Sequence, residues 1–172
     1  MEIEMKFKVD SIETIIEIAL ELGFKEVKEK HQIDYYYAVN KVSEDGKRSY
    51  LRVRNDKLKN SWSIDLHKVI SKLATEEIEV DTTEDIIKIV EYLGGKIQCI
   101  LNKKRKLFAK DNVKICIDEV KDLGFFVELE LEGEESEASV LEGLASKLKL
   151  DMDRRIHSKG YPDLLISSKK NP

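Results

Sequence analysis

Charged and apolar residues alternate with a period of two in stretch after stretch of this chain, and no other feature constrains its fold as strongly. The first stretch puts Glu2, Glu4 and Lys6 on one side of an extended backbone, with Ile3 and Met5 on the other side. A period of two is typical of a β-strand that packs its apolar side on a core. The ionic side then faces either water or an enclosed polar space.

Later stretches repeat this alternation. Their ionic sides are formed by Arg52 and Arg54, Glu77 and Glu79, Lys103 and Arg105, Asp118, and Glu128 and Glu130, while Lys68 lies in phase with Ile64 and Leu66. For a single strand, a solvated charged face is the favoured interpretation. The chain, however, groups acidic pairs and basic pairs on different strands, whereas a surface selected for solubility mixes the two signs. This grouping favours ionic faces that turn inward, where carboxylates suit Mg²⁺ or Mn²⁺ and Lys and Arg suit phosphate oxygens.

The same periodicities predict the order of elements. Strands are expected from residue 2 and over 25–39, 50–55, 62–69, 75–82, 98–109, 113–120 and 125–132, with helices over 11–22, 83–93 and 136–148 and a short helical tail over 161–166. Asp10 or Ser11 is the expected cap of the first helix and Gly23 its stop. The first two helices align without gaps up to a shared Leu-Gly, which indicates a weak internal repeat with pseudo-two-fold character. We expect an α+β fold, a single domain over residues 1–172: a closed eight-stranded antiparallel β-barrel with helices packed outside.

Composition limits which binding partners and which cellular compartment are expected. The chain of 172 residues is 37% charged, yet its net charge is only -4, which argues against nucleic-acid or membrane binding through the whole surface. Cys99 and Cys116 lack the spacing of a metal finger and are expected to be reduced thiols. The sequence shows no run of membrane-spanning length and no basic-then-apolar leader before the first strand, so we expect a cytoplasmic protein. The oligomeric state is not readable from the sequence, and a homodimer stays open.

These motifs, in this order, resemble the CYTH superfamily, also called triphosphate tunnel metalloenzymes. The resemblance rests on the Glu-x-Glu-x-Lys strand at residues 2–6, Leu-Arg-Val-Arg at 51–54, the acidic strand at 76–80, Lys-Lys-Arg at 103–105, the hairpin from 117 to 130 and the tail from 161 to 165. One segment departs from the family, which usually has Thr-x-Lys-Gly-Pro where this chain has Leu66-His67-Lys68-Val69-Ile70. The segment Gln32-x-Asp34-x-Tyr36 is similar to the branch described as cyclases.

The resemblance implies roles for the ionic residues. The metal ligands would be Glu2, Glu4, Glu77, Glu79, Asp118, Glu128 and Glu130, holding Mg²⁺ or Mn²⁺. The phosphate-binding residues would be Lys6, Arg52, Arg54, Lys68, Lys103 and Arg105, and those closest to the chemistry Lys6, Lys68, Arg105 and Asp118. Cys116 shares the face of Asp118 and is expected to be a small lining residue, not a nucleophile.

Three functions follow from such a tunnel. The first is metal-dependent hydrolysis of a triphosphate, which would be inorganic tripolyphosphate, a nucleoside triphosphate or thiamine triphosphate. The second is a class IV adenylyl cyclase, in which the ribose 3′-hydroxyl of ATP attacks the α-phosphorus and gives cyclic AMP and pyrophosphate. The third is a non-catalytic polyphosphate- or nucleotide-binding module, although phosphate binding alone would not need so many carboxylates.

Overall fold

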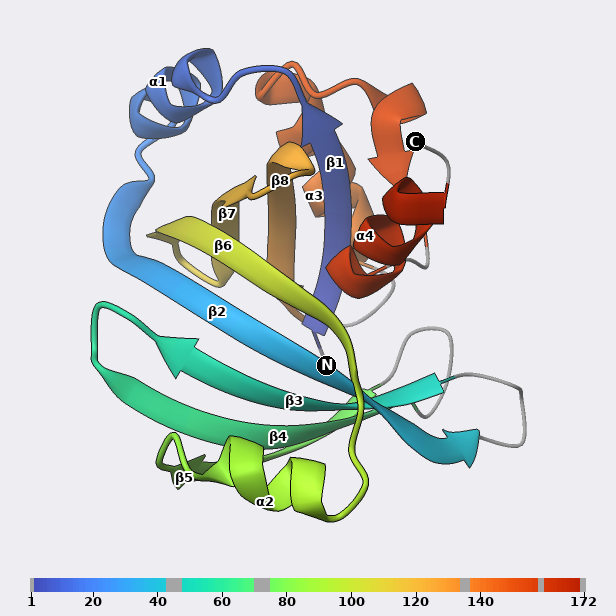
Figure 1. Ribbon diagram of the computed structural model, residues 1–172. Helices are drawn as coiled ribbons and strands as arrows, with labels where there is room; N and C mark the ends of the chain where they lie inside the picture. Colours follow the sequence, from blue (N-terminus) through green and yellow to red (C-terminus); the bar gives the residue numbers. More distant parts are fainter. Residues whose placement is uncertain (1, 43–47, 70–74, 134–136, 158–159, 171–172) are drawn as a thin grey trace. The chain divides into compact units, whose positions relative to one another are not determined.

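The described part of the chain forms an antiparallel sheet with four α-helices, an α+β architecture. The computed structural model describes residues 2–42, 48–69, 75–133, 137–157 and 160–170 (Figure 1). Its strands are β1 (Glu2–Val9), β2 (Lys25–Val42), β3 (Arg48–Asp56), β4 (Ser61–Val69), β5 (Thr75–Thr82), β6 (Ile97–Lys110), β7 (Val113–Val120), β8 (Gly124–Glu132) and β9 (Arg155–Ile156). Its helices are α1 (Glu13–Glu21), α2 (Ile86–Tyr92), α3 (Ala138–Lys147) and α4 (Tyr161–Lys170), with a 3-10 turn η2 (Met152–Arg154).

The strands form one ladder order, β5-β4-β3-β2-β6-β7-β8-β1-β9, and the chain divides into two compact units. The first unit contains residues 1–30 and 103–158, and the second contains residues 31–102 and 159–172. Strands β2 and β6 contribute residues to both units. Each unit is described by itself below.

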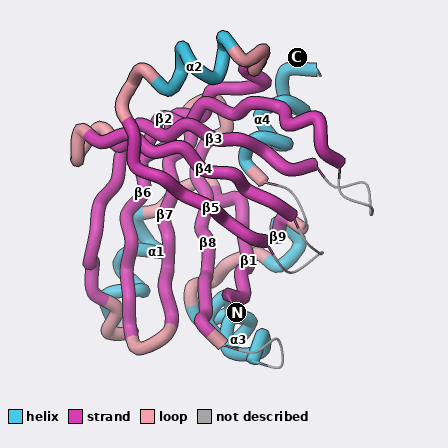
Figure 2. The backbone as a smooth tube through the Cα atoms, turned by 90° about the horizontal axis from the view of Figure 1, so that it is seen from below, coloured by secondary structure: helices cyan, strands magenta, loops and turns pink. Residues whose placement is uncertain are grey.

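In the first unit, β6, β7, β8 and β1 run side by side, and β9 pairs with the outer edge of β1 (Figure 2). The apolar sides of these strands form a core with α1 and α3, in which Phe7, Ile115 and Leu129 are fully buried. Helix α1 contributes Ile15 and Ala19 and stops before Gly23, whose φ of +86° is a left-handed conformation that favours glycine. Since the apolar sides are taken up by the helices, the ionic sides of the same strands form the other face of the sheet.

In the second unit, β3, β4 and β5 follow β2 in the ladder. Its core contains Tyr37, Val53 and Val90, with Trp62 and Ile64 packed against them, so that α2 covers one side of this part of the sheet. Helix α4 also belongs to this unit, where the Tyr50 hydroxyl donates a hydrogen bond to Asp163 Oδ1 over 3.0 Å.

The structure confirms most predicted elements and corrects some details. Strands β5 and β7 have the predicted bounds, whereas β2 continues to Val42. The predicted capping of the first helix is wrong: the N-cap of α1 is Ile12 and makes no side-chain capping bond. Within the described residues the sheet has nine strands where eight were predicted, because β9, only two residues long, gives no periodic signal.

The predicted closed barrel is not confirmed, because β5 and β9 end the strand order and no ladder joins them in the described residues. The strand–helix–strand order does occur twice, in β1-α1-β2 and β5-α2-β6. None of the helices in the described part of the chain combines the length and apolar character needed to cross a membrane.

Candidate functional site

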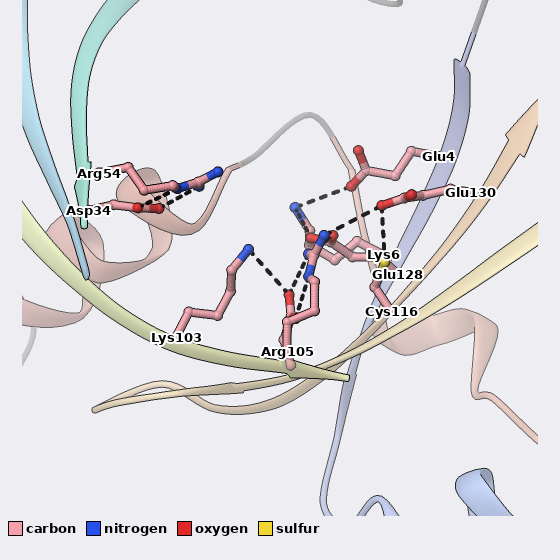
Figure 3. Close-up of polar contacts among 10 residues, drawn as sticks. Glu4, Lys6, Asp34, Arg54, Lys103, Arg105, Cys116, Glu128 and Glu130 are labelled. Carbon is pink, nitrogen blue, oxygen red and sulfur yellow. Dashed lines mark hydrogen bonds and ion pairs between the residues drawn. The ribbon is translucent and has the colours of Figure 1, made fainter. Parts of the chain in front are cut away.

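The ionic sides of four neighbouring strands meet on one face of the first unit. The ladder pairs Glu4 with Glu130 and Lys6 with Glu128 between β1 and β8, and it pairs Arg105 with Asp118 between β6 and β7. Directly paired residues of an antiparallel sheet point to the same face, so the alternation in each strand brings these groups together. Figure 3 shows the side chains of Glu4, Lys6, Arg105, Glu128 and Glu130 converging.

Glu128 lies at the centre of this cluster. Its carboxylate accepts a hydrogen bond from Arg105 and lies 3.0 Å from Lys6 Nζ. The side chain of Glu128 is only 7% exposed and that of Lys6 only 11%. Lys6 Nζ also lies 3.4 Å from Glu4 Oε1, and the Glu4 side chain is 48% exposed. Lys6 therefore connects a buried carboxylate with one that reaches solvent.

Arg105 joins the carboxylates of two strands. Its Nε and Nη2 donate to the two carboxylate oxygens of Asp118, each over 2.6 Å, and its Nη1 lies 3.6 Å from Glu130 Oε1. Lys103 Nζ lies 3.7 Å from Asp118, whose side chain is completely buried. A two-pronged pairing of this kind fixes the guanidinium plane, so Asp118 sets the direction in which Arg105 points toward Glu128 and Glu130.

These contacts shift the pKa values of Glu128 and Glu4 in opposite directions. Burial alone would raise the pKa of Glu128, but the charges of Arg105, Lys6 and Lys103 outweigh it and hold that pKa well below its ordinary value. Partial desolvation and the negative charge of Glu128 raise the pKa of Glu4 and outweigh the opposing effect of Lys6 and Arg105. Burial would lower the pKa of Lys6, yet Glu128 and Glu4 raise it, so Lys6 stays a cation. Neighbouring carboxylates with opposite shifts are a common mark of functional sites.

The donor set fits a divalent cation. Ligand atoms of Cys116, Glu128 and Glu130 all lie within 4.8 Å of one another, and Glu4 is paired with Glu130 on the adjacent strand. Carboxylate oxygens are the donors that Mg²⁺ and Mn²⁺ prefer. The residues that would hold such a cation are Glu4, Glu128 and Glu130.

The second unit carries its own ionic face. Arg54 donates from Nε and Nη2 to the two oxygens of Asp34, each over 2.7 Å, and Arg52 Nε donates to Asp65 Oδ2 over 2.8 Å. Figure 3 includes the Asp34–Arg54 pair. Tyr36 lies opposite Arg52 in the ladder, and burial raises the pKa of its hydroxyl. Both arginines are therefore oriented by buried carboxylates, as Arg105 is in the first unit.

The structure places the predicted site residues in three groups. On the ionic face of the first unit lie Glu4, Lys6, Lys103, Arg105, Asp118, Glu128 and Glu130. In the second unit lie Arg52, Arg54 and Glu79, of which Glu79 is exposed and paired with Asp65. The side chains of Glu2, Lys68 and Glu77 lie outside the described residues. In the backbone register of β4 and β5, Lys68 pairs with Glu76 and His67 pairs with Glu77.

Sequence reasoning missed three members of these faces. Asp34 and Asp65, which hold the two arginines of the second unit, were not assigned a role in the site, and neither was Cys116 as a donor. The alternation of Ser63 and Asp65 with Ile64 and Leu66 carried a signal for Asp65. Nothing in the sequence indicated which carboxylate would face which arginine.

Comparison with known proteins agrees with this geometry. The family model described as CYTH domain matches residues 1–157. A protein of Methanocaldococcus jannaschii named "Putative adenylate cyclase" is 32% identical over 135 residues, which cover 76% of each chain. A solved structure from Pyrococcus horikoshii superposes with a TM-score of 0.82 at 26% identity and covers 95% of this chain and 99% of its own.

A plant protein has the same fold at lower similarity. It comes from Hippeastrum, and its structure has a TM-score of 0.65 at 16% identity, covering 98% of this chain and 95% of its own. It is described as a "Putative adenylyl cyclase" that reveals a dominant triphosphatase activity. The match of the family model over nearly the whole chain, together with the arrangement of acidic and basic strands, shows that this chain belongs to the CYTH domain family.

Proposed function

We propose that the protein hydrolyses a triphosphate with the help of a divalent cation, Mg²⁺ or Mn²⁺. One observation supports this proposal above the others: the basic groups of Lys6, Lys103 and Arg105 share one face with the carboxylates of Glu4 and Glu128. A metal–triphosphate complex presents both a cation and a row of anionic oxygens. A face that offers both kinds of partner matches that complex better than it matches either component alone.

The basic residues would bind the phosphate chain. Lys6 and Arg105 are paired with carboxylates, so an incoming phosphate would replace one anionic partner by another. Asp118 keeps Arg105 oriented during this exchange because it holds two of the guanidinium nitrogens. Fixed cations beside the phosphate oxygens stabilise the charge that shifts onto the leaving oxygen as the P–O bond breaks.

The carboxylates would hold the cation. Glu4, Glu128 and Glu130 supply the oxygen donors, and a bound divalent cation neutralises phosphate charge and polarises the phosphoryl group. A water molecule that attacks the terminal phosphorus gives phosphate and the corresponding diphosphate, which is pyrophosphate, a nucleoside diphosphate or thiamine diphosphate. The attacking water loses its protons to solvent, and the leaving oxygen departs as part of the diphosphate.

The proposal is tested by product analysis. In the presence of Mg²⁺ or Mn²⁺ we expect phosphate together with pyrophosphate from tripolyphosphate, thiamine diphosphate from thiamine triphosphate, or ADP from ATP, without cyclic AMP. Formation of cyclic AMP and pyrophosphate from ATP would overturn hydrolysis as the main reaction. Tight binding of these compounds without turnover would favour a binding module.

A matched pair of variants links the reaction to the face. Glu4→Gln removes a charge from the carboxylate set, and we expect metal-dependent turnover to fall by about 100-fold or more. Glu119→Gln makes the same change at an exposed position of β7 and should leave turnover unchanged. Circular dichroism checks that both variants fold. Equal rates for the two variants would contradict the assignment of the face.

An adenylyl cyclase is the second candidate. It is favoured by the name of the Methanocaldococcus jannaschii relative, which at 32% identity is more similar to this chain than the Hippeastrum protein at 16%. In this reaction the ribose 3′-hydroxyl of ATP replaces water as the nucleophile and attacks the α-phosphorus. The product analysis separates the two candidates, since only the cyclase gives one cyclic AMP for each pyrophosphate.

A further inference from the structure

A buried thiol lies among the carboxylates of the candidate site. Cys116 is only 1% exposed, and its Sγ donates a hydrogen bond to Glu130 Oε1 over 3.2 Å. The ladder pairs Cys116 directly with Glu128. Mg²⁺ prefers oxygen ligands and a thiol is a poor partner for phosphate, so the proposed hydrolysis does not account for this residue.

We propose that Cys116, Glu128 and Glu130 form a binding site for a borderline or soft divalent cation, of which Zn²⁺ is the representative, through one thiolate and two carboxylates. Typical Zn–S and Zn–O bonds of about 2.3 and 2.1 Å separate neighbouring donors of a tetrahedral site by roughly 3.6 Å. The donor atoms of the three residues already lie within 4.8 Å of one another, and the Sγ to Oε1 distance is 3.2 Å. Small side-chain rotations would therefore complete three corners of a tetrahedron.

The basic neighbours of these carboxylates do not block such a cation. Arg105 pairs with Glu128 and Glu130, but it also holds Asp118 through two bonds of 2.6 Å. Lys6 pairs with Glu128 and also with Glu4 at 3.4 Å. Arg105 therefore keeps Asp118 and Lys6 keeps Glu4 as a carboxylate partner when Glu128 binds a metal ion. Zinc binding then releases one proton, which passes from the Cys116 thiol to solvent.

This site shares two carboxylates with the proposed Mg²⁺ or Mn²⁺ ligands. Zn²⁺ and a hard cation would therefore exclude each other, and Zn²⁺ would suppress metal-dependent hydrolysis. This consequence rests on the proposed function, whereas the binding itself does not.

Cobalt absorption tests the binding independently of activity. Co²⁺ bound through a thiolate gives a sulfur-to-metal charge-transfer band in the near ultraviolet, and oxygen ligands alone do not. We expect this band in the wild-type protein and in Cys99→Ser, which alters the other buried cysteine, but not in Cys116→Ser. Zn²⁺ should remove the band by displacing Co²⁺. Absence of the band in the wild type, or its persistence in Cys116→Ser, would overturn the proposal.

Two further measurements test the site with other readouts, the first a cobalt titration of a variant that keeps the thiol and the second the inhibition of hydrolysis by Zn²⁺. Glu130→Gln keeps the thiol, so it should keep the band but need roughly tenfold more Co²⁺ to reach half of its amplitude; an unchanged requirement would remove Glu130 from the site. If hydrolysis is observed, the Zn²⁺ concentration for half-inhibition should rise at least about tenfold in Cys116→Ser relative to Cys99→Ser. A cobalt band without any hydrolysis would refute the proposed function and leave the thiolate site standing.

Discussion

Replacing Asp118 by Asn tests whether the buried charges hold the candidate site together. Asp118 is fully buried and accepts both bonds of the Arg105 guanidinium, and Lys103 lies 3.7 Å away. Breaking a buried ion pair by removing one partner typically costs about 3–5 kcal/mol. Arg105 retains Glu128 and Glu130, and asparagine keeps one acceptor, so we expect the lower end of that range, about 3 kcal/mol.

The assays are urea unfolding and thermal melting of the metal-free protein at pH 7 in EDTA, both monitored by circular dichroism. For a chain of this size each kcal/mol lowers the melting temperature by about 2–4 °C, so the variant should melt about 6–12 °C below the wild type. The slope of the free energy of unfolding against urea should not change, because the same surface is exposed on unfolding.

The neighbouring residue supplies the control. Glu119 is next to Asp118 on β7, and its carboxylate lies 3.7 Å from Lys104, but these two side chains are 53% and 60% exposed. Glu119→Gln should therefore change stability by no more than about 0.5 kcal/mol. A double-mutant cycle with Arg105→Gln should show a coupling of about 2 kcal/mol. If Asp118→Asn costs no more than the control, or if the coupling is near zero, the ion pair does not organise the site.

Two more predictions concern the same unit and one concerns the second. The folded-state pKa of Glu128 is held below 4.5, so its stabilising contribution is complete above that pH and is lost as the pH falls through the folded value. The free energy of unfolding should fall on acidification, and Glu128→Gln should flatten this dependence; parallel curves for both proteins would contradict it. Phe7→Ala should cost about 3–5 kcal/mol in urea unfolding, since Phe7 is 0% exposed, while Leu20→Ala at a position 52% exposed should cost far less; similar costs would remove Phe7 from the core. Tyr50→Phe removes the bond to Asp163 and should lower stability by about 1 kcal/mol; no loss in a melting experiment would mean that this bond contributes nothing.

The extended elements were predictable because each strand carries its own periodic signal. The alternation in β1, β5 and β7 identified the strands, and in β1 and β7 it also identified the face that turns to the core. In β5 it did not, because Ile78 and Val80 are 55% and 57% exposed. Helix ends were harder, since the N-cap of α1 is the apolar Ile12 although Asp10 and Ser11 stand nearby. The two residues of β9 are too few to show any period, and their pairing with β1 depends on contacts distant in sequence.

Membership of the site was only partly predictable. Charged residues that alternate with apolar core residues, such as Glu4 and Glu128, could be assigned to an ionic face from spacing alone. Their partners could not, because the ladder register decides that Asp118 faces Arg105 and that Cys116 faces Glu128. A thiol in a charged strand has no distinctive pattern, so its proximity to two carboxylates became apparent only in the structure.

The sequence by itself determined that most of the strands have one apolar and one ionic side, and that acidic pairs and basic pairs lie on different strands. These properties are local, since a period of two requires only an extended backbone and a core on one side. The tertiary structure decided which charges meet: Glu128 lies between Lys6 and Arg105, Asp118 orients Arg105, and Cys116 joins the carboxylates. Contacts between strands are set by register, and a shift of one residue turns every side chain to the other face. The chemistry of this protein therefore depends on strand pairing as much as on the residues themselves.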